Sequence, residues 1–162
     1  MMNEQTDYQK LPAASIKAWR LEGGLWSLII YLAPAYVLFT AWTGAEYSLW
    51  FIIAVVAVAL LSTIVFVFVV PKIRWRQWQY KIDEYEIDLH HGIWFTHSTL
   101  VPVKRLQHVD TRQGPILRSY NLADVIISTA ATTHKIPALS ASKADEVRSE
   151  ISTFARKAKD DV

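Results

Sequence analysis

The five histidines are the residues that could most readily hold a metal ion. His90 and His91 are adjacent, so on a strand their side chains would point to opposite faces of a sheet. The others, His97, His108 and His134, are scattered along the chain. None of these spacings matches a helix or knuckle ligand motif, and the lack of cysteine excludes thiolate ligands and disulfides. The sequence therefore predicts no metal site and no cofactor, with the histidines at exposed or partly buried positions.

Serine-based and phosphate-binding chemistry is not indicated either. A nucleophilic serine of the hydrolase type sits in a tight, glycine-flanked turn, with a histidine and an acid as partners. None of the serines has this setting, and the five glycines form no phosphate-binding loop, because Gly23 and Gly24 precede an apolar run. We therefore expect that the protein is not an enzyme. Its net charge of +2 is too small to indicate nucleic-acid binding.

Two long uncharged segments define the class of protein instead. Leu49 to Val70 is a run of 22 residues, which as a helix is about 33 Å long and crosses a hydrocarbon core of about 30 Å. Leu25 to Trp42 is a second run just upstream. Neither contains a charged residue, His, Asn or Gln, the groups that transporters and channels place in their spans. The sequence predicts a membrane hairpin without a transport pathway, and Pro34 is expected to kink its first helix.

Basic residues flank this hairpin on one side only. Lys17 and Arg20 precede the first span, and the second is followed by Lys72, Arg74 and Arg76. The short loop between the spans has neither Lys nor Arg. The positive-inside rule then places both termini in the cytoplasm. We expect the three basic residues after the second span to contact anionic lipid, for about 1 kcal/mol each.

Tryptophan is concentrated at the expected membrane surfaces. Amphipathic aromatic rings favour the headgroup layer, where one end of the ring system is apolar and the other is wet. The tryptophans near a predicted interface are Trp19, Trp26, Trp42, Trp50, Trp75 and Trp78. We expect these six to act as interfacial anchors.

After the hairpin the pattern changes to short strands. Alternating or continuous apolar segments predict strands at Trp78–Ile82, Glu86–Leu89, Leu122–Thr129 and Thr132–Ile136. Asp83–Tyr85 is expected to form the first turn, and Pro137 to end the last strand. With the segments around Ser98–Val103 and Leu106–Thr111, the pattern indicates six or seven strands.

The chain ends with a helical pattern. Ser142, with Asp145 three residues later, resembles a capping box. The apolar residues that follow recur at spacings of three and four, at Ala144, Val147, Ile151, Phe154 and Ala158. The sequence thus predicts an N-terminal cytoplasmic segment (1–24), a two-span hairpin (25–70) and a domain of strands covered by one helix (71–162).

Several short motifs in this domain occur together. They are Trp78-Gln79-Tyr80-Lys81-Ile82, Gly92-Ile93, Pro102-Val103-x-Arg105-x-Gln107-x-Val109, Gln113-Gly114-Pro115, Arg118, and the segment from Leu122-Ala123-Asp124-Val125 to Thr129-Ala130. With two spans before them, these motifs resemble the YdbS-type bacterial membrane proteins, whose domain is of the pleckstrin-homology-like (PH-like) class. Asn121 stands where that family usually has glycine, and Asn tolerates a left-handed backbone better than most residues.

The resemblance implies both a fold and a role. The fold is a membrane α-helical hairpin of two spans plus an α+β cytoplasmic domain, in which a PH-like bent antiparallel β-sheet is capped by the C-terminal helix. The implied location is the bacterial inner membrane, and the family has no established catalysis. We expect a non-enzymatic interaction or scaffold module that contacts membrane lipid and binds another PH-like-domain membrane protein or a second copy of itself.

Two alternative roles stay open at this point. One is a lipid-responsive domain that binds an anionic headgroup, and the other is an accessory subunit of a transport or envelope-stress system. Lipid-binding PH domains use basic residues around the first strand-to-strand turn, whereas the turn here, Asp83–Glu86, is acidic. A partner peptide could instead add to an open sheet edge, which needs little sequence signature.

Four residues that carry the resemblance are expected to cluster around a bend of the sheet: Arg105, Gln107, Gln113 and Arg118. Either Arg105 pairs with Asp110 or Asp124 and holds the sheet corner, or the four residues form a polar contact with a partner.

Overall fold

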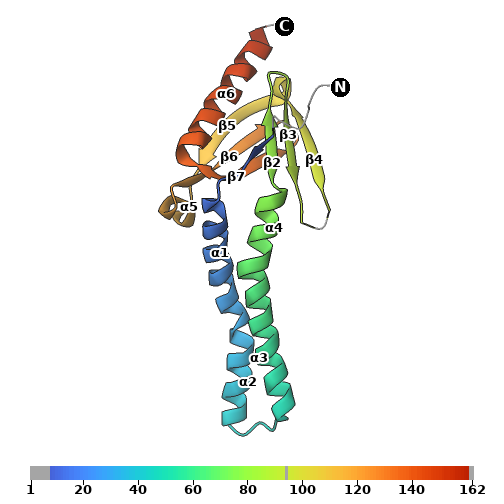
Figure 1. Ribbon diagram of the computed structural model, residues 1–162, viewed down its shortest axis with the longest axis vertical. Coiled ribbons are helices and arrows are strands. Elements are labelled where there is room, and N and C mark those ends of the chain that lie inside the picture. Colours follow the sequence, from blue (N-terminus) through green and yellow to red (C-terminus); the bar gives the residue numbers. More distant parts are fainter. Residues whose placement is uncertain (1–7, 94, 161–162) are drawn as a thin grey trace.

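Two antiparallel helical rods form the long axis of the molecule (Figure 1). In this computed structural model, which describes residues 8–93 and 95–160, the first rod consists of α1 (Ala14–Ile30) and α2 (Leu32–Trp42). The second rod consists of α3 (Leu49–Ile64), the π-helical segment η1 (Val65–Val69) and α4 (Val70–Gln77). Each rod is 29 residues long and apolar enough to cross a membrane. Most of the large apolar side chains on the rods are exposed, as in helices that face lipid.

Pro34 disturbs the first rod as predicted. Proline has no N–H, so the carbonyl of the residue four positions earlier, Ile30, loses its helical partner. The helix is interrupted at Tyr31, between α1 and α2, and resumes with a hydrogen bond from the Ala35 N–H to the Tyr31 carbonyl of 3.1 Å.

Both rods extend beyond the predicted spans on the domain side. α1 begins at Ala14 rather than at residue 25, and α4 continues to Gln77. About 20 helical residues suffice to cross the hydrocarbon core, so the last turns of each rod pack against the domain. There the Trp75 indole N–H donates to the Leu11 carbonyl (2.8 Å), and the Ser15 hydroxyl donates to the Ala138 carbonyl (2.7 Å). The hairpin therefore joins the domain through packed helix, not through a linker.

In the described part of the chain, seven strands form two antiparallel sheets. The first sheet has the order β1 (Gln9–Lys10), β2 (Gln79–Ile82), β3 (Glu86–His91) and β4 (His97–Pro102). The second has the order β5 (Leu106–Arg112), β6 (Leu122–Thr129) and β7 (Thr133–Ser140). The 3₁₀ turn η2 (Val103–Arg105) joins the sheets, α5 (Pro115–Ser119) joins β5 to β6, and α6 (Ala141–Asp160) follows β7.

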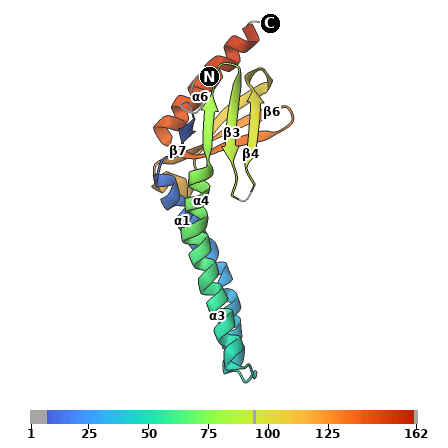
Figure 2. The same cartoon turned by 45° about the vertical axis from the view of Figure 1, so that its right-hand side comes forward.

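The two sheets and α6, which Figure 2 shows above the rods, enclose one apolar core. Alternation along β3 turns Ile87 and Leu89 inward, where both side chains are buried. The apolar face of α6 buries Ala144, Val147 and Ile151. The predicted fold, a membrane-type hairpin followed by a bent antiparallel sheet with a C-terminal helix, is confirmed.

Two predicted boundaries near the end of the chain are wrong. α6 begins at Ala141, and the hydroxyl that accepts the Lys143 N–H, at 3.4 Å, belongs to Ser140 rather than to Ser142. β7 does not end at Pro137, because the β6–β7 register shifts there, and this bulge takes the proline out of the hydrogen-bond ladder. The next residue, Ala138, has φ of +52°.

The N-terminal segment also contributes to the domain. Gln9 and Lys10 pair with Tyr80 and Gln79, so they form a short strand beside β2 that the sequence pattern did not indicate. A two-residue strand is too short to show a period of two, which explains why it escaped prediction.

Replacing Gly23 should loosen the packing of the two rods. A Cβ atom at this position would lie 2.8 Å from the Phe66 carbonyl oxygen, within the π-helical segment. We expect Gly23→Ala to lower the stability of the detergent-solubilised protein by about 1–3 kcal/mol, measured by thermal unfolding. Gly24→Ala is the control, because no atom lies within 4 Å of its added Cβ. Equal losses in the two variants would show that the close approach does not matter.

Candidate functional site

The four residues of the predicted cluster lie at opposite ends of β5. Arg105 ends η2 and Gln107 is the second residue of β5, whereas Gln113 and Arg118 follow the other end of the strand. The strand has seven residues, which at about 3.3 Å each separate the two pairs by roughly 20 Å. The predicted cluster is therefore wrong. Figure 1 places α5 beside the top of α1, and helix α1 contacts it there.

Arg105 does not hold the sheet corner. Its side chain is exposed and forms no hydrogen bond or ion pair within the described residues. Asp124 instead binds the Lys135 ammonium (2.7 Å) and accepts the Ala138 N–H (2.8 Å). Asp110 lies 3.6 Å from the His108 ring. The structural alternative for Arg105 is wrong, and the contact of the exposed residues with a partner stays a prediction.

Asp124 has the structural role that was expected of Arg105. Its side chain is buried, and its carboxylate satisfies the backbone N–H of Ala138, which sits in the strained bulge of β7. Gln113 has a similar local role, since its amide donates to the Leu122 carbonyl at 2.8 Å and closes the α5 connection. Arg118 is exposed in the last turn of α5.

The juxtamembrane basic residues divide into two kinds. Lys72 and Arg76 are exposed on α4, so their contact with anionic lipid stays a prediction. Arg74 is partly buried, and its guanidinium lies 4.3 Å from the ring centroid of Trp19. This cation–π contact joins α1 to α4, and a lipid contact of the partly exposed Arg74 stays a prediction.

The predicted aromatic anchors divide in the same way. Three of them are largely exposed on the rods: Trp26, Trp42 and Trp50. Trp19 and Trp78 are each only 7% exposed and belong to the domain core, and Trp75 packs against that core. Because the rods continue into the domain, these three rings stabilise the junction. The buried Trp19 and Trp78 are therefore not lipid anchors, whereas an anchoring role of the partly exposed Trp75 stays a prediction.

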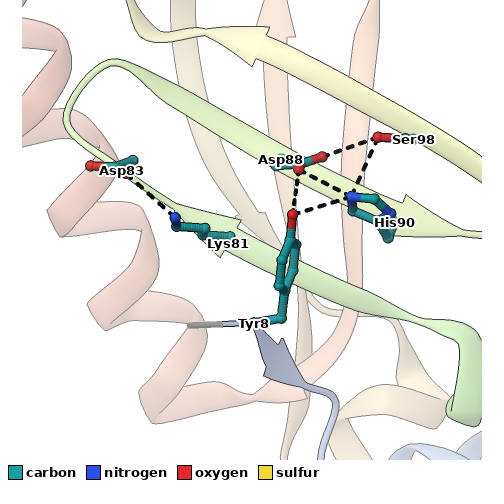
Figure 3. A network of polar contacts seen from close by, with 6 residues as sticks. All are labelled: Tyr8, Lys81, Asp83, Asp88, His90 and Ser98. Atoms are coloured by element: carbon teal, nitrogen blue, oxygen red, sulfur yellow. Dashed lines mark hydrogen bonds and ion pairs between the residues drawn. The ribbon is translucent and has the colours of Figure 1, made fainter. Parts of the chain in front are cut away.

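A polar cluster that the sequence reasoning missed lies on the outer face of the first sheet (Figure 3). The Tyr8 hydroxyl donates to Asp88 at 2.7 Å, and the same carboxylate oxygen lies 3.0 Å from His90 Nε2. The Ser98 hydroxyl donates to the other Asp88 oxygen at 3.4 Å. Partial burial alone would raise the pKa of Asp88, but the hydrogen bonds from Tyr8 and His90 outweigh it and lower the pKa.

The spacing of Asp88 and His90 could have revealed half of this cluster. Residues two apart on a strand share a face, and the β3–β4 register places Ser98 opposite His90. Tyr8 could not be placed, because its position depends on the short strand β1.

The geometry of this cluster does not fit a catalytic triad. In a triad the histidine faces the serine with one ring nitrogen and the acid with the other. Here Ser98 (3.3 Å), Asp88 (3.0 Å) and Tyr8 (3.4 Å) all approach the same nitrogen, Nε2 of His90. One nitrogen cannot donate to the carboxylate and accept the serine proton together, so the cluster fits a clasp that ties the N-terminal segment to the sheet.

His91 lies on the opposite side of β3. Its ring stacks on Trp78, with centroids 5.1 Å apart, and its Nδ1 has no hydrogen-bond partner among the described residues. Burial lowers the pKa of His91, and the positive charges of His97, His134 and other neighbours add to the effect. The folded protein therefore favours a neutral ring at this position.

The turn that binds headgroups in lipid-binding PH domains is poorly placed here. Figure 1 shows the β2–β3 turn at the end of the domain far from the rods. Asp83 and Glu84 in this turn are exposed, and their carboxylates approach Lys81 (3.8 Å) and Lys157 (3.6 Å). Both the charge and the position disfavour headgroup binding at this turn.

One edge of the first sheet is open. Among the described strands, β4 pairs only with β3, so every second residue of His97–Pro102 presents its backbone groups along the other edge. Leu100 on this strand is 52% exposed. This edge is the best candidate for a binding surface, because unpaired N–H and C=O groups can accept another strand.

The fold thus defines a membrane-type hairpin that carries a PH-like domain, and comparison with known proteins agrees. Residues 12–155 match the family described as Bacterial PH domain. The chain is also 44% identical over 161 residues to the UPF0699 transmembrane protein YdbS of Bacillus subtilis (strain 168), covering 99% of this chain and 100% of that protein. No solved structure matches the chain.

The chain therefore belongs to the bacterial PH domain family, and the predicted resemblance to YdbS-type proteins is confirmed. Together with the two exposed apolar rods, the transmembrane relative shows that this is a membrane protein.

Removing the Asp124 carboxylate should destabilise the domain more than removing its cation. Asp124→Ala leaves the buried Ala138 N–H without an acceptor, which typically costs about 1–3 kcal/mol. Lys135 is half-exposed, so we expect Lys135→Ala to cost less than about 1 kcal/mol. Thermal unfolding of both purified variants measures the difference. A larger loss for the lysine variant would contradict a backbone role for Asp124.

The stability of the protein should fall on mild acidification because of His91. The pKa of His91 is lower in the folded protein than in the unfolded chain. As the pH falls through about 6.5, the unfolded chain therefore binds a proton at this position while the ring in the folded protein is still neutral. Stability is then full above that pH and declines as the pH falls towards 5. His91→Phe keeps a ring on Trp78 and should flatten the decline in unfolding temperature, whereas His108→Gln, at an exposed ring, should leave it unchanged. Identical profiles for wild type and His91→Phe would disprove this account.

Proposed function

We propose that this protein is a non-enzymatic docking module that spans the bacterial inner membrane twice, with both termini in the cytoplasm. The observation that carries the proposal is the open edge of β4, a six-residue strand on which every second residue points its backbone groups away from β3, in a domain joined to the membrane hairpin. A partner strand that adds to this edge gains affinity from main-chain hydrogen bonds. The polar cluster around His90 supports a binding role over catalysis, since its contacts converge on one nitrogen.

The composition of β4 supports binding at this edge. Natural edge strands are commonly protected from pairing by Lys, by Pro or by a bulge. In β4 the only such residue is Pro102, at the end of the strand, and the register with β3 runs without a shift. The exposed Leu100 adds an apolar side chain for contact with a neighbouring strand.

The hairpin indicates which partner fits best. Because α4 runs into β2 through a single residue, Trp78, the height of β4 above the bilayer is fixed by helix length. Another membrane protein with PH-like domains on similar spans would present its own strand edge at the same height. We therefore propose such a protein as the partner, and a second copy of this chain is the competing possibility that the experiment distinguishes.

A second copy would have to pair in one particular way. Figure 1 shows β4 running roughly along the axis of the rods. Two copies in the same membrane, inserted in the same direction, are related by a two-fold axis along the membrane normal. This rotation keeps the strand direction but turns the second sheet face over, so the same backbone groups of the two β4 edges would oppose each other. A regular ladder would need a shift of one residue that breaks the two-fold symmetry, so a different PH-like protein fits the edge better than a second copy.

The absence of cysteine makes the edge directly testable in native membranes. Leu100→Cys carries a cysteine-linked photo-crosslinker on β4, and Thr153→Cys carries it on the exposed face of α6. We expect a discrete adduct from position 100 that mass spectrometry identifies as a PH-like-domain membrane protein, and none from position 153.

Mass spectrometry of the same adduct distinguishes the second copy. A dimer that contains only peptides of this chain would identify self-association, in place of a second protein. No adduct and no dimer from position 100, or the same products from position 153, would overturn the docking proposal.

A further inference from the structure

The loop between β3 and β4 lies on the side of the domain that faces the membrane. Figures 1 and 2 both show this loop turning back from the sheet towards the rods, beside α4. The Gln77 amide, at the end of α4, donates to the Ile93 carbonyl at 3.3 Å. The loop is therefore held next to the helix that emerges from the bilayer.

The position of α4 relative to the bilayer sets the height of the loop. The uncharged run ends at Val70, and Gln77 is seven residues further along the helix, or about 10 Å at 1.5 Å per residue. Each headgroup layer extends roughly 5–8 Å beyond the hydrocarbon core. A loop that turns back from the level of Gln77 along α4 therefore reaches the headgroup layer.

An exposed aromatic side chain stands on this loop. Phe95 is 79% exposed, although water is a poor environment for a phenyl ring. Trp94, its neighbour, lies outside the described residues, and the proposal rests on Phe95. An aromatic ring at a bilayer surface buries apolar area that the domain itself leaves uncovered.

The backbone of the loop gives Phe95 a defined position. Gly92 has φ of +151°, and a Cβ atom there would collide with the Phe95 carbonyl oxygen. The preceding residue, His91, is stacked on the buried Trp78. The tight turn and the stacked ring fix the base of the loop on the domain core.

Two exposed basic residues lie near this loop. The exposed Lys72 and Arg76 lie on α4, at the level of the loop. The exposed acidic residues of the β2–β3 turn, Asp83 and Glu84, lie at the opposite end of the domain (Figure 1). Lys72 and Arg76 therefore favour the approach of the loop to a bilayer with anionic lipid.

We propose that the β3–β4 loop inserts Phe95 into the headgroup layer and forms a membrane contact separate from the two spans. The hairpin alone fixes the height of the domain, whereas a contact at the side of α4 also fixes its tilt against the bilayer. This contact needs lipid only and does not depend on the proposed partner at β4.

The experiment measures how close the loop comes to lipid in the full-length protein. Thr96→Cys, an exposed position that leaves Phe95 in place, is labelled with a fluorophore and reconstituted into vesicles whose lipids carry a nitroxide quencher near the headgroup. Glu86→Cys serves as the control because it adjoins Tyr85, an aromatic residue 78% exposed at the far turn. Vesicles of phosphatidylcholine alone are compared with vesicles that also contain phosphatidylglycerol.

We expect several-fold stronger quenching at position 96 than at position 86, in both kinds of vesicle. Phe95→Asp should reduce the quenching at position 96 to the level of position 86, whereas Tyr85→Asp should change neither. Thermal unfolding checks that the exposed substitutions leave the domain folded.

Three results would overturn the proposal. Equal quenching at the two positions would mean that the loop faces water, leaving it available to a protein partner. Quenching that Phe95→Asp does not reduce would mean that the loop is near the bilayer without insertion. Quenching confined to anionic vesicles and lost at high salt would assign the contact to the basic residues of α4.

Discussion

The structure depends on one continuous connection, the run of helix from the membrane segment into the first sheet. α4 ends at Gln77 and β2 begins at Gln79, so no flexible linker separates the spans from the domain. The contact of Arg74 with Trp19 and the hydrogen bond from Trp75 to the Leu11 carbonyl hold the two rods together at this point. Residues that would be lipid anchors in a loosely tethered protein become parts of a rigid joint. The rigid joint thereby fixes the orientation of the domain surfaces relative to the bilayer.

The larger elements could be predicted from the sequence because each has a strong local pattern. The two uncharged runs, the continuous apolar strand Leu122–Thr129 and the amphipathic face of α6 required no knowledge of the rest of the chain. Features that depend on contacts between distant residues could not be predicted. The acceptor that Asp124 provides for Ala138, 14 residues away, is one example, and the clasp between Tyr8 and Asp88, 80 residues apart, is another. The predicted clustering of Arg105 with Gln113 was wrong for a similar reason. The two residues are close in sequence, but the extended strand β5 lies between them and holds them apart.

Several titratable side chains of the domain have structural partners and do not converge on a shared site. Asp124 satisfies a backbone group, Asp88 and His90 hold the N-terminal segment, and His91 stacks on Trp78 at the base of the loop. Arg105 and Gln107 are exposed at the far end of the domain, and the polar residues left for binding are therefore on the surface. A domain of this kind offers backbone edges and exposed side chains to its surroundings.

The membrane and the fold together limit what can bind at β4. One end of the strand, His97, follows the loop that turns towards the bilayer, and the other end, Pro102, leads into the 3₁₀ turn η2, where the chain leaves the first sheet. A partner segment that continued beyond His97 would run into the headgroup layer, and beyond Pro102 it would lose its pairing strand. The edge therefore accepts a segment of about six residues, roughly 20 Å long. A segment this short gives few backbone hydrogen bonds, so useful affinity requires that the partner be held in the same membrane, where linkage raises its effective concentration.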